Sequence, residues 1–175
     1  MRAVQRQDKS AFQQLMTRHL DSLYSYAIRL TRDTNNAEDL VQETWSRVWS
    51  NGAKYTAGKA KFSTWLYRIL YNVFVDQYRR HQQPAAAMAD AQGHDELSDL
   101  QANEQLKERL DCALKQLSSN QRAALLLFHQ QGFSTREVAN IMHINVRAAE
   151  SLLVRARRAL RASLTQEIGN EENMP

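Results

Sequence analysis

Arginines recur on one face of a segment near the C-terminus, and their chemistry is that of a phosphate ligand. Arg147, Arg155 and Arg158 share this face with Ser151 at helical spacing. A guanidinium stays charged and offers a planar fork of donors that fits phosphate oxygens. The opposite face carries the apolar residues Ala149, Leu152, Leu153, Ala156 and Leu160. The segment therefore predicts a helix that binds a nucleic-acid backbone, with a merely solvated basic face as the alternative.

A shorter helix and a tight turn precede this basic helix. Ser134 and Glu137 have the spacing of a capping box at the start of the shorter helix. Residues 143–145 follow as the turn, and Asn145 is placed to cap the basic helix. The expected apolar stripe of the shorter helix is Val138, Ile141 and Met142, with Ala139 at a close helix crossing. This arrangement is typical of a helix-turn-helix, whose second helix lies in the major groove of DNA.

Residues 62–81 hold a second candidate nucleic-acid site, because aromatic and basic residues interleave along one expected helix. The residues concerned are Trp65, Tyr67, Arg68, Tyr71, Phe74, Tyr78, Arg79 and Arg80. Unpaired bases stack on aromatic rings at about 1–3 kcal/mol each, while arginines bind the phosphates. The alternative is that the rings belong to the hydrophobic core, and we prefer it for Trp65 and Phe74. We expect Ser63 to cap this helix, after a basic loop over residues 50–61.

Residues typical of catalytic or metal sites are not arranged for such chemistry. The five histidines lack the spacing of metal ligands, and Cys112 has no second cysteine with which to pair. The sequence contains no glycine-rich phosphate loop. We therefore expect a protein that is not an enzyme and that uses no cofactor and no metal.

The net charge of +4 over 175 residues is distributed in blocks. Residues 1–80 and 105–165 each carry +6, whereas residues 81–104 carry −5 and residues 166–175 carry −3. Five glycines and two prolines are few, and helical periodicity runs through most of the chain, which predicts an all-α protein. Two basic blocks separated by an acidic one suggest two modules that bind polyanions.

We expect two small helical domains. An N-terminal helical bundle occupies residues 1–81, and a C-terminal four-helix domain with the helix-turn-helix occupies residues 105–165. A flexible acidic linker over 82–104 joins them, and residues 166–175 form an acidic tail. The sequence shows no apolar run long enough to span a membrane and no signal peptide. A single cysteine fits a reducing compartment, so we expect a cytoplasmic protein.

The N-terminal bundle has two further helices by pattern. Ser10 and Gln13 are spaced as a capping box for the first, and Asn35 or Asn36 would cap the second. The buried face of the second helix is Leu40, Val41, Thr44, Trp45, Val48 and Trp49. Its polar face is Asp39, Gln42, Glu43 and Ser46. This polar face is either solvated or a docking surface for a basic partner.

Three segments resemble one protein family. Residues 39–49 (DLVQETWSRVW) closely resemble the DLVQETFLRVW signature of bacterial ECF-type sigma factors, members of the sigma-70 superfamily. Residues 62–69 (FSTWLYRI), with Asn72, Asp76, Arg79 and Arg80, resemble the segment that follows this signature in the family. The helix-turn-helix resembles the family's C-terminal domain at Gln121, Arg122, Leu125 to Leu127, Gly132, Ser134, Glu137, Val138, Ala139 and Arg155 to Arg157. The resemblance covers roughly residues 8–165 in the family's order.

The resemblance implies a subunit that binds core RNA polymerase, directs it to promoters and helps to open the duplex. Polymerase docking would use Asp39, Gln42, Glu43 and Arg47. The melted −10 element, with a base flipped into a pocket, would be bound by Asn51, Lys54, Tyr55, Lys59, Lys61, Trp65, Tyr67, Arg68, Tyr71, Asn72, Arg79 and Arg80. The duplex −35 element would be bound by Ser134, Thr135, Arg136, Arg147, Ala148, Glu150, Ser151, Arg155 and Arg158.

The resemblance also implies an inhibitory partner, an anti-sigma factor anchored in the inner membrane that would hold the chain there. Several positions depart from the family's pattern. Ser118, Ser119 and Asn120 replace its usual Leu-Pro-containing turn, and Ser118 with Gln121 can still make a capping box there. Glu150 and Leu152 stand where a lysine and an arginine are common, so the preferred −35 sequence does not carry over, and Tyr71 stands where an arginine is frequent. The main alternative is a stand-alone helix-turn-helix regulator whose N-terminal bundle senses a signal or dimerises. A general RNA-binding or scaffold protein is the second alternative.

Overall fold

The computed structural model describes residues 5, 6, 8–56, 58, 60–82 and 112–171. Within these ranges the secondary structure is helical and contains no strand, which confirms the all-α prediction. Most of the predicted linker lies outside the described residues. The final helix continues to Glu171, well into the segment 166–175 that we predicted as an acidic tail.

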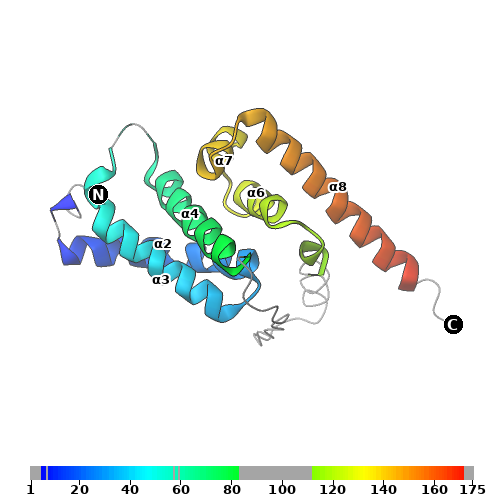
Figure 1. Ribbon diagram of the computed structural model, residues 1–175, viewed down its shortest axis with the longest axis horizontal. Helices are drawn as coiled ribbons and strands as arrows, with labels where there is room; N and C mark the ends of the chain where they lie inside the picture. Colours follow the sequence, from blue (N-terminus) through cyan, green and yellow to red (C-terminus); the bar gives the residue numbers. More distant parts are fainter. Residues whose placement is uncertain (1–4, 7, 57, 59, 83–111, 172–175) are drawn as a thin grey trace.

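The N-terminal half is a bundle of three helices, α2 (Lys9–Thr31), α3 (Thr34–Asn51) and α4 (Phe62–Gln82). A short 3₁₀ helix, η1 (Gly52–Lys54), follows α3. α3 packs against both α2 and α4, as Figure 1 shows, and a set of leucine, valine and aromatic side chains fills the centre of the bundle.

The three caps predicted for this half are wrong, and acidic residues explain two of the errors. Asp8, not Ser10, caps α2, and its carboxylate accepts from the Ala11 N–H at 3.0 Å. Asp33, rather than Asn35 or Asn36, caps α3 through the Asn36 N–H at 2.7 Å. A carboxylate satisfies the free amides as a hydroxyl or amide does and also interacts favourably with the helix dipole.

α4 begins at Phe62, two residues earlier than a cap at Ser63 would place it. The Trp65 N–H already donates to the carbonyl of Lys61 at 3.2 Å. Ser63 therefore lies inside the first turn of α4 and is not its cap.

The C-terminal half comprises a helical turn over residues 112–115 and three helices, α6 (Ser119–His129), α7 (Thr135–Met142) and α8 (Val146–Glu171). Capping boxes start α6 at Ser118 and α7 at Ser134, as predicted. His143 adopts a left-handed φ of 55° and ends α7. The Asn145 side chain accepts from the Ala148 N–H at 2.8 Å, which confirms its capping role. The helix-turn-helix is thus present, and α8 extends away from the body in Figure 1.

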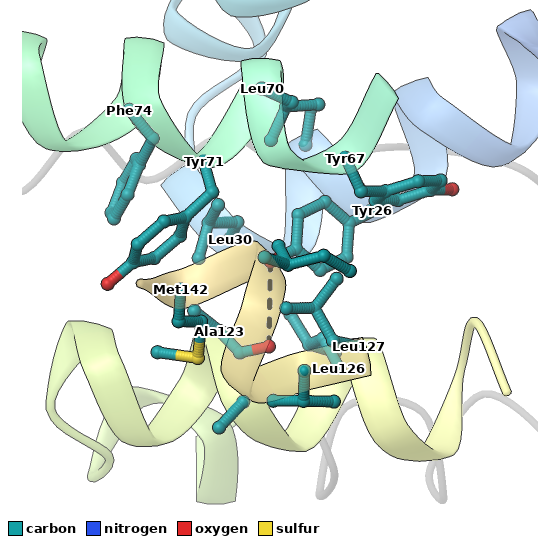
Figure 2. Packing of buried hydrophobic residues seen from close by; sticks show 14 of the residues in the cluster. Tyr26, Leu30, Tyr67, Leu70, Tyr71, Phe74, Ala123, Leu126, Leu127 and Met142 are labelled. Carbon is teal, nitrogen blue, oxygen red and sulfur yellow. Dashed lines mark hydrogen bonds between the residues drawn. The ribbon is translucent and has the colours of Figure 1, made fainter. Parts of the chain in front are cut away.

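The two halves pack against each other through one continuous hydrophobic cluster. α2 contacts α6, and α4 contacts α7. Figure 2 shows Tyr67, Leu70 and Tyr71 of α4 above Leu126 and Leu127 of α6. At the centre of this contact the buried Tyr26 hydroxyl of α2 donates to the Ala123 carbonyl of α6 at 3.5 Å.

Candidate nucleic-acid and polymerase interfaces

The outer face of α8 presents the predicted basic residues to solvent. Arg147, Arg155 and Arg158 are exposed together with Ser151, while Ala149, Leu153 and Ala156 are buried on the inner face. Arg155 donates from its Nε to the Ser151 carbonyl of its own helix at 3.2 Å, which orients the guanidinium along the exposed face. Glu150 is exposed and Ala148 is half-buried at the start of the same helix. The predicted separation of an apolar and a cationic face is confirmed.

α7 contacts α8, and the beginning of α7 carries the other residues predicted to bind the −35 element. Arg136 is exposed and Thr135 is half-buried. Ser134 is engaged in the cap, because its hydroxyl donates to a Glu137 carboxylate oxygen at 2.8 Å and its N–H donates to the same oxygen at 2.9 Å. These two bonds, joined by the nearby Lys61 ammonium, lower the pKa of Glu137. Ser134 therefore holds the first turn of α7 in place.

The residues predicted to bind the −10 element fall into three groups. The first gathers at the mouth of the loop before α4. The Tyr55 ring lies 5.3 Å from the half-buried Trp65 ring, centroid to centroid, and the Tyr55 hydroxyl donates to the Ala60 carbonyl at 3.1 Å. Lys54 and Lys61 are exposed beside them. Asn51 donates to the Arg47 carbonyl at 3.1 Å, and Lys59 lies outside the described residues.

The second group lies along α4 and is largely covered by the C-terminal half. Tyr67 is 3% exposed and Tyr71 is 7% exposed. Burial raises the pKa of Tyr67 to about 12. Arg68 is exposed, but its Nε lies 3.1 Å from the His143 Nε2 at the end of α7. The prediction that Phe74 belongs to the hydrophobic core is confirmed, because its ring is buried. Tyr67 and Tyr71 are buried as well.

The C-terminal part of α4 remains open. Tyr78 is 46% exposed, and Arg79 and Arg80 are exposed. Arg80 donates from its Nε to the Asp76 carbonyl at 3.3 Å, and Asn72 is half-buried. Asn72 and Arg79 line a cleft of about 840 Å³ between α4 and the C-terminal half. Sequence reasoning missed this cleft, because its other wall comes from residues 118–120 and from the end of α7.

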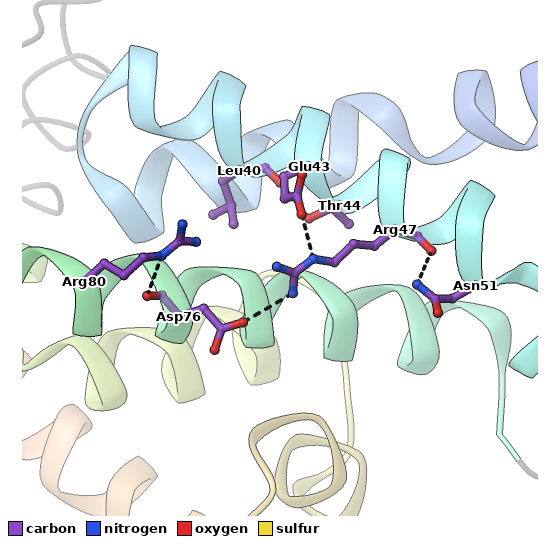
Figure 3. Close-up of polar contacts among 7 residues, drawn as sticks. All are labelled: Leu40, Glu43, Thr44, Arg47, Asn51, Asp76 and Arg80. Carbon is purple, nitrogen blue, oxygen red and sulfur yellow. Dashed lines mark hydrogen bonds and ion pairs between the residues drawn. The ribbon is translucent and has the colours of Figure 1, made fainter.

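The predicted polymerase-docking face lies on α3. Asp39 and Gln42 are exposed, while Glu43 is joined to Arg47 through an Nε–Oε1 contact of 2.7 Å. The Arg47 Nη1 also lies 3.3 Å from an Asp76 carboxylate oxygen of α4, as Figure 3 shows. Glu43 and Asp76 together raise the pKa of Arg47, with the Glu43 hydrogen bond as the largest cause. The exposed face of α3 therefore carries a negative charge at Asp39, and the ion pairs Glu43–Arg47 and Arg47–Asp76 hold the side chain of Glu43 in place.

Asp76 is the functional neighbour that sequence reasoning did not connect with this face. It lies 29 positions from Arg47, on another helix, and no local spacing pairs the two.

Among the described residues no group of histidine, cysteine, aspartate or glutamate is arranged to hold a metal ion. The described helices include none that is long and apolar enough to cross a membrane.

Comparisons with known proteins agree with this geometry. The sigma-70 region 2 family matches residues 15–83, and the sigma-70 region 4 family matches residues 107–160. The chain is 33% identical over 158 residues to the ECF RNA polymerase sigma factor SigL of Mycobacterium tuberculosis, covering 89% of each chain. It is 29% identical over 156 residues to the ECF RNA polymerase sigma factor SigM of Bacillus subtilis, covering 87% of this chain and 94% of SigM.

Solved structures show the same fold. The sigma factor RpoE of Bartonella quintana, in complex with the anti-sigma factor NepR, superposes with a TM-score of 0.73 at 28% identity, covering 89% of this chain and 97% of RpoE. CnrH, in complex with the cytosolic domain of CnrY, superposes with a TM-score of 0.69 at 25% identity over 93% of both chains. The helix-turn-helix, the DLVQETWSRVW segment on α3 and these relatives lead to one conclusion: the chain belongs to the ECF-type sigma factors of the sigma-70 family and is a transcription initiation factor.

Proposed function

We propose that three surfaces of this sigma factor divide the work of initiation. The exposed face of α3 around Asp39 binds core RNA polymerase. The loop before α4 and the aromatic and basic residues of α4 that are exposed bind the melted −10 strand. The outer face of α8, with the beginning of α7, binds the −35 duplex in the major groove.

The observation that carries this proposal is the separation of charge between the surfaces. Arg147, Arg155 and Arg158 are exposed on α8, whereas Asp39 and Gln42 are exposed on α3. Cationic side chains bind the phosphate backbone of DNA and release its counterions. An acidic face repels DNA and is complementary to a basic surface of a protein partner. One chain thus offers different surfaces to polymerase and to promoter.

A charge reversal tests the docking surface. We expect Asp39→Lys to reduce retention on immobilised core RNA polymerase by at least about tenfold, because a like charge would meet the basic partner. Asp21→Lys is the matched control, since Asp21 is an exposed aspartate on α2. Both variants should keep the helix content of the wild type. Equal retention of the two variants would remove the docking assignment.

We also propose control by an anti-sigma factor. RpoE and CnrH, which share the fold, were solved with such partners, NepR and the cytosolic domain of CnrY. A partner anchored in the inner membrane would hold the chain there until a signal releases it. Fractionation of cells that express the chain with and without its genomic neighbours tests this. The chain should move to the membrane fraction only when the neighbours are present, and an unchanged distribution would contradict the proposal.

A further inference from the structure

Gln5, which precedes α2, holds the short 3₁₀ helix η1 from outside. Its side-chain amide nitrogen donates to the Tyr55 carbonyl at 2.7 Å and to the Gly52 carbonyl at 3.2 Å. An amide group of this kind has two hydrogens, so the two bonds use its full donor capacity. The acceptors lie 47 and 50 positions away in the sequence, at the first residue of η1 and at the residue that follows η1.

η1 gains from this contact because it is a single turn. The Tyr55 N–H closes the turn on the Gly52 carbonyl at 3.1 Å. Hydrogen bonds in a 3₁₀ turn have poorer geometry than those of an α-helix. Asn51, at the start of η1, gives it no side-chain cap and donates instead to the Arg47 carbonyl at 3.1 Å. Gln5 therefore supports both ends of the turn through tertiary hydrogen bonds.

Tyr55 is the residue whose position Gln5 fixes. Gln5 binds its backbone carbonyl, and the Tyr55 hydroxyl donates to the Ala60 carbonyl at 3.1 Å. Between these two anchors the Tyr55 ring lies 5.3 Å from the Trp65 ring and 6.0 Å from the Phe62 ring, measured between centroids. All three rings are half-buried, so each keeps part of its surface accessible.

This group of three rings has the chemistry of a site for unpaired bases. Lys54 and Lys61, the chain neighbours of Tyr55 and Phe62, are exposed. Bases stack on aromatic rings while cationic side chains bind the phosphates. Binding is tighter when the rings already stand in place, because the cost of ordering them is not charged against the affinity.

We propose that Gln5 is a positioning residue for the melted −10 strand. Through the carbonyls of Gly52 and Tyr55 it holds the Tyr55 ring beside Trp65, where the ring can receive an unpaired base. This inference rests on the proposed function of the loop before α4. Gln5 lies outside residues 15–83, which match the sigma-70 region 2 family, so the match with the family does not extend to it.

Replacement of Gln5 by methionine tests this role. Gln5→Met keeps the length of the side chain and removes both donors without adding a charge. Gln13→Met is the matched control, because Gln13 is an exposed glutamine on α2. The full-length chain is combined with core RNA polymerase, and the probe is a fluorescent pool of random 12-nucleotide single strands read by anisotropy. Polymerase without the chain gives the background, and retention on immobilised polymerase is measured in parallel.

We expect Gln5→Met to weaken single-strand binding by about tenfold, the scale of one stacking contact between a base and a ring, with polymerase retention unchanged. Gln13→Met should behave as the wild type in both assays. Equal single-strand affinity of Gln5→Met and the wild type would overturn the inference. A matching loss of polymerase retention would overturn it as well, because Gln5 would then only stabilise the bundle.

A double-mutant cycle with Tyr55→Ala separates positioning from any other effect of Gln5. If Gln5 acts through Tyr55, its replacement matters only while the Tyr55 ring is present. We expect Gln5→Met to reduce the affinity by less than about twofold in the Tyr55→Ala background. The same tenfold loss in both backgrounds would overturn the inference and leave the role of Tyr55 intact. Unchanged single-strand affinity of Tyr55→Ala alone would instead overturn the proposed role of this loop, and the inference with it.

Discussion

Arg122 provides the most demanding test of how the two halves are held together. Its guanidinium is buried and serves two carbonyl oxygens, those of Leu30 and Leu114. Replacement with methionine keeps the length of the side chain and removes every donor. The Leu114 carbonyl also accepts from the Leu117 N–H at 3.2 Å, so only the Leu30 carbonyl would be left without a donor, at a cost of about 1–3 kcal/mol. Relief of the desolvation penalty offsets part of this cost, since burial lowers the pKa of Arg122 to about 10.

We therefore expect Arg122→Met to reduce the free energy of unfolding by about 1 kcal/mol. Urea denaturation of the full-length chain measures this, and the midpoint should fall by about 0.5 M at an ordinary slope. Arg122→Lys is the matched variant: it keeps the charge but lacks the planar fork, so its loss should be intermediate. A midpoint that stays the same or rises in Arg122→Met would refute the assigned role of Arg122.

Three further predictions use other groups. Tyr67 has a folded-state pKa of about 12 against an ordinary value of 10.0, so its contribution to the free energy of unfolding is present below pH 10 and is lost as the pH rises to 12. Between these pH values Tyr67→Phe should lose about 2 kcal/mol less unfolding free energy than the wild type. The same dependence of unfolding free energy on pH in both proteins would contradict the burial of Tyr67. Glu137 has a pKa below its ordinary 4.5, so its contribution to stability is present above pH 4.5 and is lost as the pH falls through the lowered value. In Glu137→Gln the melting temperature should therefore change less with pH in that range. A melting temperature that depends on acid pH as in the wild type would argue against the role of Glu137 in the cap. Arg155→Ala on α8 should reduce the slope of log affinity for duplex DNA against log salt concentration by about 1, whereas Arg18→Ala on α2 should leave this slope unchanged. Equal slopes for the two variants would show that duplex DNA does not bind the outer face of α8.

The sequence predicted those features whose partners lie within a few residues of each other. The capping box at Ser134, the turn at His143 and the cap at Asn145 are all present, because each depends on positions at most five residues apart. The caps at Ser10 and Ser63 failed for an equally local reason. In the first case a nearby aspartate competes for the amides, and in the second the helix begins two residues earlier than the predicted cap allows.

The contact between the halves could not be predicted, because its partners are far apart along the chain. Arg68 contacts His143, which lies 75 positions away in the sequence, and Arg122 contacts Leu30, which lies 92 positions away. An alternation of aromatic and basic residues does not distinguish a ring that stacks on a base from a ring that packs on a second domain. Tyr67 and Tyr71 belong to the packed class in this structure, and their spacing on α4 suits either role.

The central claim is that the chain starts transcription by directing polymerase to promoters. Run-off transcription with purified core RNA polymerase, the purified chain and a pool of genomic DNA fragments tests it most directly. We expect transcripts from a discrete set of start points, all of them absent when the chain is omitted and sharply reduced with Asp39→Lys. Transcripts without any defined start point, or the same transcripts with and without the chain, would contradict the claim.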